Sequence, residues 1–398
     1  MFTNSSRNIL MLTKEVHLMR TLAIILSEPL SRYSEKGEIK RNYYNPGNYF
    51  DAVHFLSPTV QDIASREIQV TVGTARLFIH PIGKLSWKNP FSFFAQRNRI
   101  RSVMEKIKPD IIRAYDPSIG GYYATHIGKQ LHIPSVLSIH IHPDEQRRFS
   151  QRFKLSILLF VAKYFFEPLA LQRASKIICV THFVQGYALR KLGNARITNA
   201  GKITVIYNKV DTAQFIPRKP KPRSSLPLTV LSVGRLDPQK YQECLIRAIK
   251  DLDIRLILIG QGSEEQRLKK LCAEFGIEDR VAFIPSVPNR KIHTYYQNAD
   301  LFAIATHYEG FCIPVLEAMA SGLPVIASDI PPIREILGDA GMLVPNTSEA
   351  FRFALQQMID SRPLRAQFGR KARKRALQFS GTRMEKKEQQ LYSRLLQR

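Results

Sequence analysis

The sequence predicts an α/β protein made of two doubly wound domains, each built on a parallel sheet. The chain has 398 residues, which suits two domains of roughly 200 residues, each large enough for its own core. Short apolar runs alternate with polar helical stretches along the chain, the pattern of strands joined by crossover helices. Residues 217–227 combine proline with positive charge, which is typical of an extended linker between domains.

The first domain is expected to begin near residue 19. Residues 1–18 have no clear period, and we expect Met19 to be the functional start, with the preceding residues either disordered or an artefact of start-site assignment. A first buried strand follows within residues 19–27. We interpret residues 177–181 as the last strand of this domain and residues 203–208 as the segment that leads out of it. The strands expected between these limits are at residues 51–56, 77–80, 111–114 and 135–140.

The second domain contains a βαβ unit around which the prediction of function is organised. Apolar residues 301–306 and 325–328 flank a short helix, in which Pro314 suits the first helical position and Gly322 the residue just past the end. Glu309 is then expected in the loop before this helix, and Glu317 in its first turn. The other strands expected in this domain are at residues 228–234, 254–260 and 281–287.

The start of this helix has the chemistry of a nucleotide-sugar site. Its free N–H groups concentrate roughly half a positive charge, enough to attract a phosphate. The carboxylates of Glu309 and Glu317 would be repelled by a phosphate, so they are suited to accept hydrogen bonds from hydroxyls. A ligand with a central diphosphate and a sugar at each end meets both demands. The residues expected to face such a donor on the helix start are Gly310, Phe311, Cys312 and Ile313.

Two cations follow the first strand of the second domain. Arg235 and Lys240 come off the carboxyl end of the strand at residues 228–234, the edge at which open α/β sheets bind ligands. Two positive charges can there neutralise the roughly two negative charges of a diphosphate and stabilise it as a leaving group. Taken alone, an Arg and a Lys five residues apart are more typical of a solvated face. The sequence around them decides between a solvated face and a phosphate site.

That context is a resemblance to a known family. The string Tyr308-Glu-Gly-Phe-Cys-Ile-Pro-Val-Leu-Glu-Ala-Met-Ala-Ser-Gly-Leu-Pro-Val-Ile326 resembles the signature of the glycosyltransferases of group 1, family 4. Residues 233–240 are similar to the phosphate-binding element of that family. The resemblance covers nearly the whole chain and is most specific over residues 228–345. It implies the GT-B fold, in which two Rossmann-like domains face a cleft and a C-terminal helix crosses back to the first domain.

The resemblance also implies a mechanism that retains anomeric configuration and needs no metal or other cofactor. In such a mechanism Arg235 and Lys240 stabilise the departing diphosphate. Glu309 orients the transferred sugar, Glu317 binds the ribose hydroxyls, and His140 supports the face of the sugar. We therefore expect Glu309, His140, Arg235 and Lys240 to be the catalytic residues.

Further site residues follow from the same resemblance. Gly37 corresponds to a glycine that faces the donor phosphates or the acceptor across the cleft, and Ser286 and Val287 correspond to the loop that holds the base. The family's histidine is usually followed by glycine, which is absent here, so the sequence leaves open whether His140 or His142 points into the cleft. A His-x-His pair without a further acidic or cysteine ligand does not favour a metal site.

The expected domain boundaries follow from these assignments. The junction element at residues 208–211 resembles the family's Asn-Gly-Val-Asp, with Lys209 in place of the glycine. The segments expected are a possibly disordered extension at 1–18, an acceptor-side domain at 19–208, a linker at 209–227, a nucleotide-sugar-binding domain at 228–375 and a returning helix at 376–398.

The net charge of +26 is unevenly distributed. Residues 1–200 hold 28 Lys and Arg against 13 Asp and Glu, residues 201–350 hold 18 against 17, and residues 351–398 hold 13 against 3. Because the excess avoids the segment with Glu309 and Glu317, we expect it to serve an anionic membrane surface. The apolar and aromatic stretch at residues 153–171 could be a partly buried helix, interrupted near Pro168, or an interfacial surface. The basic C-terminal tail is expected beside the basic first domain, on one membrane-facing side.

Cysteine usage and hydropathy indicate a compartment. The 4 cysteines lie far apart without a CxxC pair, which favours a reducing cytosol over a disulfide framework or a zinc site. We expect no signal peptide, and no apolar run of the sequence is near the ~20 residues that span a bilayer. We therefore expect a cytoplasmic protein, peripheral at the inner face of the cell membrane.

The sequence thus predicts a retaining hexosyltransferase that moves a sugar from a nucleoside diphosphate sugar to a hydroxyl of a lipid-linked or surface-polysaccharide precursor. One alternative is a nucleotide-sugar epimerase or phosphorylase on the same fold. Another is a nucleic-acid-binding protein, prompted by a pI near 10.0, although the chain has no nucleic-acid-binding motif. The donor base, the sugar, the acceptor and the oligomeric state are not legible from the sequence.

Overall fold

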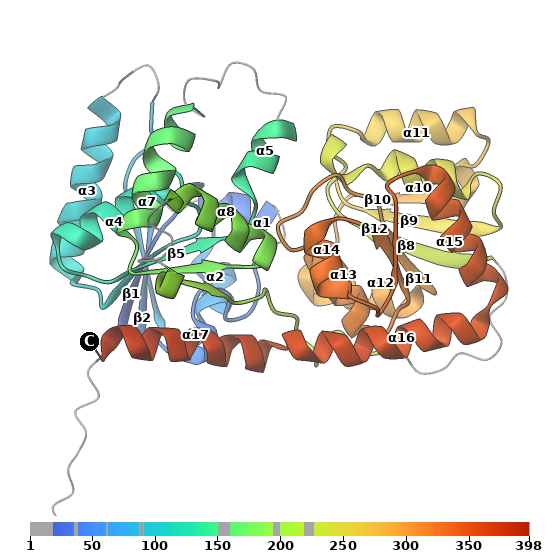
Figure 1. The fold of residues 1–398 in the computed structure, drawn as a ribbon. Helices are drawn as coiled ribbons and strands as arrows, with labels where there is room; N and C mark the ends of the chain where they lie inside the picture. The colour runs from blue at the N-terminus through green and yellow to red at the C-terminus, as the bar shows by residue number, and fades with distance from the viewer. Residues whose placement is uncertain are drawn as a thin grey trace, which may run out of the picture.

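The computed structural model describes residues 19–35, 39–60, 63–86, 89, 91–149, 160–193, 200–218 and 227–397. Within them the chain forms two parallel sheets, one of seven strands and one of six (Figure 1). The prediction of two doubly wound α/β domains is confirmed. Residues 1–18, Gly37 and most of the predicted linker at 217–227 lie outside the described residues.

The seven-stranded sheet of the first domain has the strand order β3-β2-β1-β4-β5-β6-β7. Its central strands β1, β4 and β5 are buried along their whole length because helices cover both of their faces. The expectation that residues 203–208 only lead out of the domain is wrong: β7 pairs with β6 in parallel, with Ile203 opposite Ile177. The strands are β1 (Thr21–Ile25), β2 (Ala52–Ser57), β3 (Arg76–Pro81), β4 (Ile111–Ala114), β5 (Ser135–Ile139), β6 (Lys176–Cys179) and β7 (Ile203–Val205).

Helices cover the two faces of this sheet in separate groups. One face packs against α3 (Phe91–Ile107), α4 (Ile119–Gln130), α7 (Glu167–Arg173) and α8 (His182–Leu192). The other packs against α1 (Leu30–Glu35), α2 (Ser65–Val72) and α17 (Gly381–Leu396). The helix α5 (Pro143–Phe149) follows β5, and a π-helix, η3 (Ala162–Phe166), leads into α7. Pro168 lies in the first turn of α7, so the helical stretch passes from π-helix to α-helix there and is not broken by the proline.

The six-stranded sheet of the second domain has the order β10-β9-β8-β11-β12-β13. Its strands are β8 (Leu228–Val233), β9 (Ile254–Ile259), β10 (Val281–Ile284), β11 (Leu301–Ile304), β12 (Val325–Ser328) and β13 (Met342–Val344). The short edge strand β13 was not expected. One face is covered by α10 (Gln242–Ile249), α11 (Glu265–Glu274) and α15 (Ser348–Asp360), the other by α12 (Asn289–Asn298), α13 (Ile313–Ala320), α14 (Pro331–Leu337) and α16 (Arg362–Ala376).

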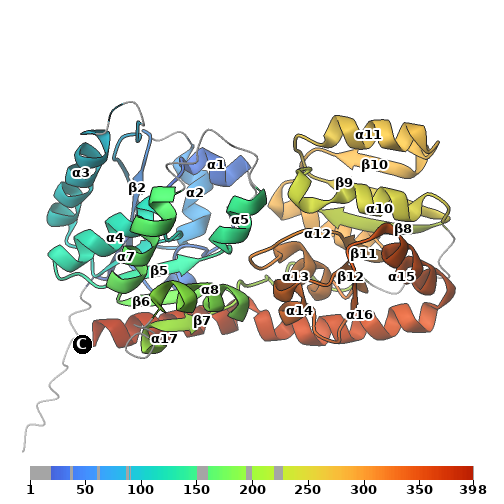
Figure 2. The same cartoon turned by 45° about the horizontal axis from the view of Figure 1, so that its top comes forward.

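The C-terminal helices connect the domains. Figure 2 shows α16 and α17 running in succession along one side of the molecule, α16 under the second domain and α17 under the first. Tyr392 of α17 is fully buried, with its ring centroid 5.1 Å from that of Phe50. Lys209, which replaces the glycine of the junction element, pairs with Glu385 of α17 at 2.5 Å. The predicted crossing of the C-terminal helix to the first domain is confirmed.

The C-terminal helix α17 lies beside the first domain but not beside the aromatic stretch. Figures 1 and 2 place α17 at one end of the first domain and the start of α3 at the other. The described part of the aromatic stretch adjoins α3, since the ring centroids of Phe93 and Phe166 are 5.5 Å apart. The physical reason is that α17 buries Leu391 and Leu395 against the sheet face opposite to α3 and α7. None of the helices in the described ranges is long and apolar enough to span a bilayer.

Candidate active site

A buried ion pair lies where β8 and β11 end. Lys240 closes the short helix η6 (Pro238–Lys240) after β8, and Glu309 lies in the loop after β11. The Nζ atom of Lys240 is 2.5 Å from Oε1 of Glu309, and the two side chains are 11% and 7% exposed. Burial disfavours the charged amine, but the neighbouring Glu309 carboxylate raises the pKa of Lys240 above its ordinary value. The structure therefore brings these two predicted site residues into direct contact.

The loop between Glu309 and α13 is wedged against the first domain. A Cβ atom on Gly310 would lie 1.8 Å from the carbonyl oxygen of His140, so the close approach requires glycine. The hydroxyl of Thr181 donates to the Gly310 carbonyl at 3.3 Å. Cys312, the N-cap of α13, has a φ of 67°, a left-handed conformation that costs a non-glycine residue of the order of 1 kcal/mol. The tertiary contacts thus hold this loop in a shape that it would not adopt alone.

Glu317 lies further along α13 than expected. The helix begins at Ile313, so Pro314 is its second residue and the prediction that Glu317 lies in the first turn is wrong. The reason is that the turn after β11 closes one residue earlier than the proline suggested. The Glu317 carboxylate accepts hydrogen bonds from Lys40 Nζ at 2.9 Å and from the Tyr296 hydroxyl at 3.0 Å. Because Lys40 belongs to the first domain, this contact joins the two domains at the site.

Among the described contacts, Arg235 pairs with neither Glu309 nor Glu317. It forms an ion pair with Asp237, and its side chain is 59% exposed. Its Nη2 donates to Oε1 of Gln239 at 3.4 Å, and Gln239 donates to the carbonyl of Tyr308 at 2.8 Å. Arg235 therefore reaches the loop before Glu309 through Gln239.

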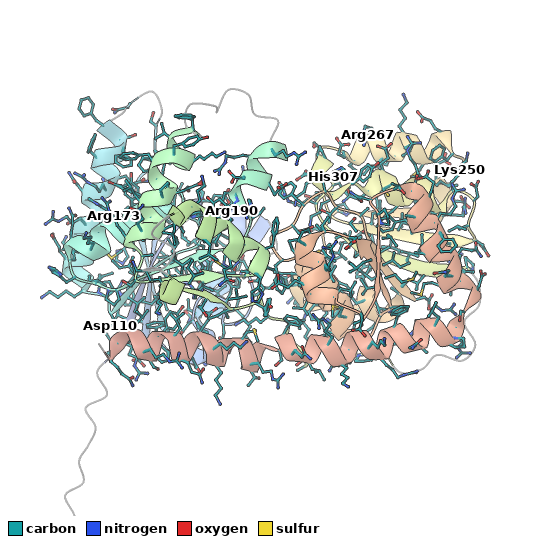
Figure 3. The ribbon with its side chains drawn as sticks, in the orientation of Figure 1. Asp110, Arg173, Arg190, Lys250, Arg267 and His307 are labelled. Carbon is teal, nitrogen blue, oxygen red and sulfur yellow. The ribbon has the colours of Figure 1, made fainter. Side chains whose placement is uncertain are left out.

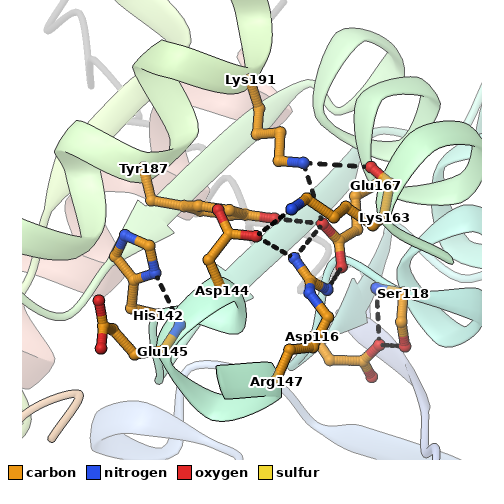
Figure 4. A network of polar contacts seen from close by, with 10 residues as sticks. All are labelled: Asp116, Ser118, His142, Asp144, Glu145, Arg147, Lys163, Glu167, Tyr187 and Lys191. Carbon is orange, nitrogen blue, oxygen red and sulfur yellow. Dashed lines mark hydrogen bonds and ion pairs between the residues drawn. The ribbon is translucent and has the colours of Figure 1, made fainter. Parts of the chain in front are cut away.

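The two candidate histidines have different surroundings. The Nε2 atom of His142 lies 2.9 Å from Arg190 of α8, which is labelled in Figure 3. Its Nδ1 accepts from the main-chain N–H of Glu145 at 3.4 Å (Figure 4), and its ring packs against Phe183 and Tyr187. His142 is therefore engaged within the first domain.

His140 directly follows β5, where its carbonyl meets the Gly310 loop. Its ring centroid is 5.4 Å from that of Tyr115. Burial, and then the positive charge of Arg113, lower the pKa of His140 to about 4, so the ring is neutral near pH 7. Its Nε2 atom is buried and has no hydrogen-bond partner among the residues that the structure describes.

A charge network supports the elements behind His142 (Figure 4). Glu167, which is 2% exposed, accepts from Arg147 at 2.5 Å and from the hydroxyl of Tyr187, and Lys191 lies 3.8 Å away. Asp144 also pairs with Arg147, at 2.7 Å. Because these residues come from α5, α7 and α8, the network holds the three helices together.

The remaining predicted site residues are not drawn into this contact set. Ser286 and Val287 follow β10 at the carboxyl edge of its sheet, with Ser286 exposed and Val287 packed partly against the core. Gly37 lies outside the described residues. Sequence reasoning missed Lys40 and Tyr296, neither of which belongs to a motif. The one available signal was that Lys40 comes three residues after Gly37, directly after a loop that the resemblance had assigned to the donor phosphates or the acceptor.

The first domain also contains a cavity of about 390 Å³ at the carboxyl ends of β1 and β3. Its lining is mainly apolar and includes Ile25, Ile82 and Tyr123. Asp116 beside it accepts hydrogen bonds from the hydroxyls of Ser27 and Ser118, both of which line the cavity. Across the described ranges, no three His, Cys, Asp or Glu side chains are grouped so that they could hold a metal ion.

Comparison with known proteins places the chain in a family. The family model described as glycosyl transferases group 1 matches residues 215–375, and the model described as Glycosyltransferase Family 4 matches residues 51–214. The chain is 28% identical over 291 residues to sulfoquinovosyl transferase SQD2 of Arabidopsis thaliana, covering 69% of this chain and 54% of that protein. It is also 28% identical over 206 residues to O-antigen chain mannosyltransferase RfbU of Salmonella typhimurium, covering 50% of this chain and 56% of that protein.

These matches span about half the length of the two curated relatives. Among solved structures, HepE of Anabaena in complex with UDP has a similar fold, with a TM-score of 0.73 and 18% identity over 94% of this chain and 100% of that chain. The two family models together span residues 51–375, and the two parallel sheets and the returning helix have the GT-B arrangement. The chain therefore belongs to the group 1 glycosyltransferases.

Proposed function

We propose that this protein transfers a sugar from a nucleoside diphosphate sugar to a hydroxyl group, with retention of anomeric configuration. The observation that carries the proposal is the buried Lys240–Glu309 pair beside the start of α13. A cation and a helix N-terminus attract the diphosphate, and a carboxylate accepts hydroxyls of the sugar. The similarity in fold to HepE, which was solved in complex with UDP, supports this choice of donor.

In the proposed reaction, the bond between the anomeric carbon and the diphosphate oxygen breaks as the acceptor oxygen bonds to the same face of that carbon. The acceptor's proton passes to the departing diphosphate, which leaves with the bonding electron pair. Lys240, Arg235 and the N–H groups at the start of α13 stabilise its charge. Glu309 orients the sugar, Glu317 binds the ribose, and the neutral His140 ring lies beside the sugar. We expect no metal to be needed.

The first test is donor binding followed by product analysis. UDP, GDP and ADP sugars are screened by thermal shift, because a bound donor raises the melting temperature. The donor that binds is then incubated with and without an acceptor hydroxyl, and the anomeric configuration of the product is read by NMR. A product of inverted configuration would contradict retention. Conversion of the donor to a different nucleotide sugar in the absence of an acceptor would favour an epimerase.

The proposed acceptor is a lipid-linked or surface-polysaccharide precursor. The mainly apolar cavity of the first domain can bind an apolar part of such a molecule, while Ser27 and Ser118 offer hydroxyls at its edge. The similarity to RfbU, an O-antigen chain mannosyltransferase, favours the same class of acceptor. Turnover is compared between a lipid-linked acceptor and the same head-group sugar without its lipid. Faster turnover of the lipid-linked acceptor would support binding of the apolar part.

We also propose that the first domain contacts an anionic membrane through an exposed aromatic surface at the start of α3 and around η3. Arg97 stacks over Phe94, and Lys163 over Tyr164, so cations accompany the aromatic rings. Aromatic side chains that enter the lipid interface, beside cations that meet anionic head groups, are typical of peripheral binding. We call this surface the aromatic tip, and it consists of Phe91, Phe94, Phe160, Tyr164 and Phe165.

Vesicle sedimentation tests the aromatic tip. We expect binding to vesicles that contain anionic lipid, weaker binding at high salt, and a marked loss in a Phe94→Ser, Phe165→Ser double variant. The matched control is Phe353→Ser, which removes an exposed phenylalanine of the second domain. If the double variant and the control bind the vesicles equally, the aromatic tip does not contact the membrane.

A further inference from the structure

Three cations of the candidate active site are each paired with a carboxylate. Lys240 pairs with Glu309, Arg235 with Asp237, and Lys40 with Glu317. The first two pairs lie within the second domain. The third joins the domains, since Lys40 comes from the loop between α1 and β2, and its Nζ atom is 2.9 Å from the Glu317 carboxylate.

The main chain around Lys40 is tied to both domains. The carbonyl of Ile39 accepts from Nδ2 of Asn289, the first residue of α12, at 3.0 Å. The carbonyl of Lys40 accepts from the N–H of Tyr43 at 3.2 Å, which closes a turn. Lys209 at the domain junction donates to the carbonyl of Asn42 at 2.9 Å. The Lys40 amine is therefore delivered to Glu317 by a segment whose position the fold determines.

The charges of these pairs cancel, whereas a nucleoside diphosphate sugar brings about two negative charges into the same space. A diphosphate is bound well only if cations exchange their carboxylates for phosphate oxygens. The carboxylates then become free to accept hydroxyl hydrogen bonds. Glu317 is suited to this exchange, because Tyr296 binds its other oxygen at 3.0 Å and keeps the carboxylate in place when Lys40 leaves.

We propose that Lys40 is a donor-binding residue contributed by the first domain. On donor binding, its ammonium group leaves Glu317 and binds the diphosphate, while Glu317 accepts a hydroxyl of the nucleoside. This inference rests on the proposed function. The flexible lysine side chain and its three N–H donors allow the exchange without a movement of the main chain. Through Lys40, a donor that is bound to the second domain also contacts the first domain.

The test compares ligands that differ in their phosphates. The affinities of UDP, GDP and ADP, and of the corresponding nucleosides, are measured by calorimetry on the whole protein. The variants are Lys40→Met, which removes the charge, and Lys40→Arg, which keeps it. The matched control is Lys129→Met, which removes an exposed cation near the end of α4. Melting temperatures establish that each variant is folded.

We expect Lys40→Met to weaken the best-bound nucleoside diphosphate by about 10- to 100-fold, the size of a charge-assisted hydrogen bond. Binding of the nucleoside should be unchanged or tighter, because Glu317 is already free. Lys40→Arg should retain most of the affinity, and Lys129→Met should match the unaltered protein. An equal loss of affinity for the nucleoside and the diphosphate, or no loss for either, would overturn the proposed role of Lys40 and leave the proposed function standing. If the unaltered protein binds none of the diphosphates, both this inference and the proposed function fail.

Discussion

Two buried cation–carboxylate pairs, one in each domain, have nearly the same chemistry but different surroundings. In the second domain, Lys240 and Glu309 meet at 2.5 Å beside a strained loop. In the first, Arg113 of β4 meets Glu388 of α17 at 2.8 Å. Arg113 also bonds to Ser138 and to the hydroxyl of Tyr392. Burial opposes its charge, but Glu388 raises the pKa of Arg113 well above the usual value.

The difference teaches that burial of an ion pair does not by itself mark a functional site. Arg113 is 2% exposed, and its donors are met by groups from a sheet and from the returning helix, so the pair fastens α17 to the first domain. Lys240 and Glu309 lie at the carboxyl ends of strands next to a helix start, where a ligand can replace each partner. The Arg113–Glu388 pair should therefore matter for stability, and the Lys240–Glu309 pair for turnover.

The largest effect is expected from breaking the structural pair. Arg113→Met leaves Glu388 without its buried cation and should lower the free energy of unfolding by about 3–5 kcal/mol, as measured by denaturant unfolding. Nucleotide affinity of the folded fraction should change little. The control is Arg101→Met, which breaks an exposed pair with Glu105 and should cost less than about 1 kcal/mol. Equal losses in the two variants would mean that the Arg113 pair contributes no more than a surface contact.

The next effect is expected from the pair at the candidate active site. Lys240→Ala and Glu309→Ala should each lower turnover by about 100- to 1,000-fold, because each removes an interaction with the charge or orientation of the reacting groups. Both variants should remain folded, as judged by circular dichroism and melting temperature. Near-normal turnover in either folded variant would sink the assignment of that residue.

A smaller effect is expected from the loop that joins the two regions. Gly310→Ala places a methyl group against the His140 carbonyl and should lower turnover by roughly 10-fold, since a misplaced loop misaligns the helix start. Gly201→Ala is the matched control, because a Cβ atom there meets nothing within 4 Å. If the two variants have the same turnover, the domain contact at Gly310 is unimportant for catalysis.

The smallest effect concerns pH. The pKa of His140 is lowered from 6.5 to about 4, so the unfolded chain binds more protons than the folded one between these values, and stability falls as the pH drops through this window. In His140→Gln, the loss of melting temperature between pH 7 and pH 5.5 should be shallower, by an amount equivalent to about 1 kcal/mol. The exposed His132→Gln should keep the slope of the unaltered protein. An unchanged slope in His140→Gln would show that the buried His140 ring does not contribute to the pH dependence of stability.

Prediction of the fold succeeded where the pattern was strong and local. Short, mostly apolar runs such as residues 111–114 and 325–328 coincide with β4 and β12. The two three-residue strands, β7 and β13, were missed because so short a run has no period of its own and is stabilised by pairing with a neighbouring strand. The helix start at Ile313 was misplaced by one residue, because the left-handed turn at Cys312 closes the loop before the proline, and no local pattern marks a non-glycine residue for that conformation.

By itself, the sequence determined the α/β class, the βαβ unit with Glu309 and Glu317, and the two cations that follow β8, because spacing along the chain decides which side chains share a strand end. Only the tertiary structure decided that Lys40 reaches Glu317, that Arg235 pairs with Asp237, and that α17 lies opposite the aromatic tip. These contacts join residues distant in sequence or choose among several possible partners. Their selection depends on how the domains pack, which no local pattern encodes.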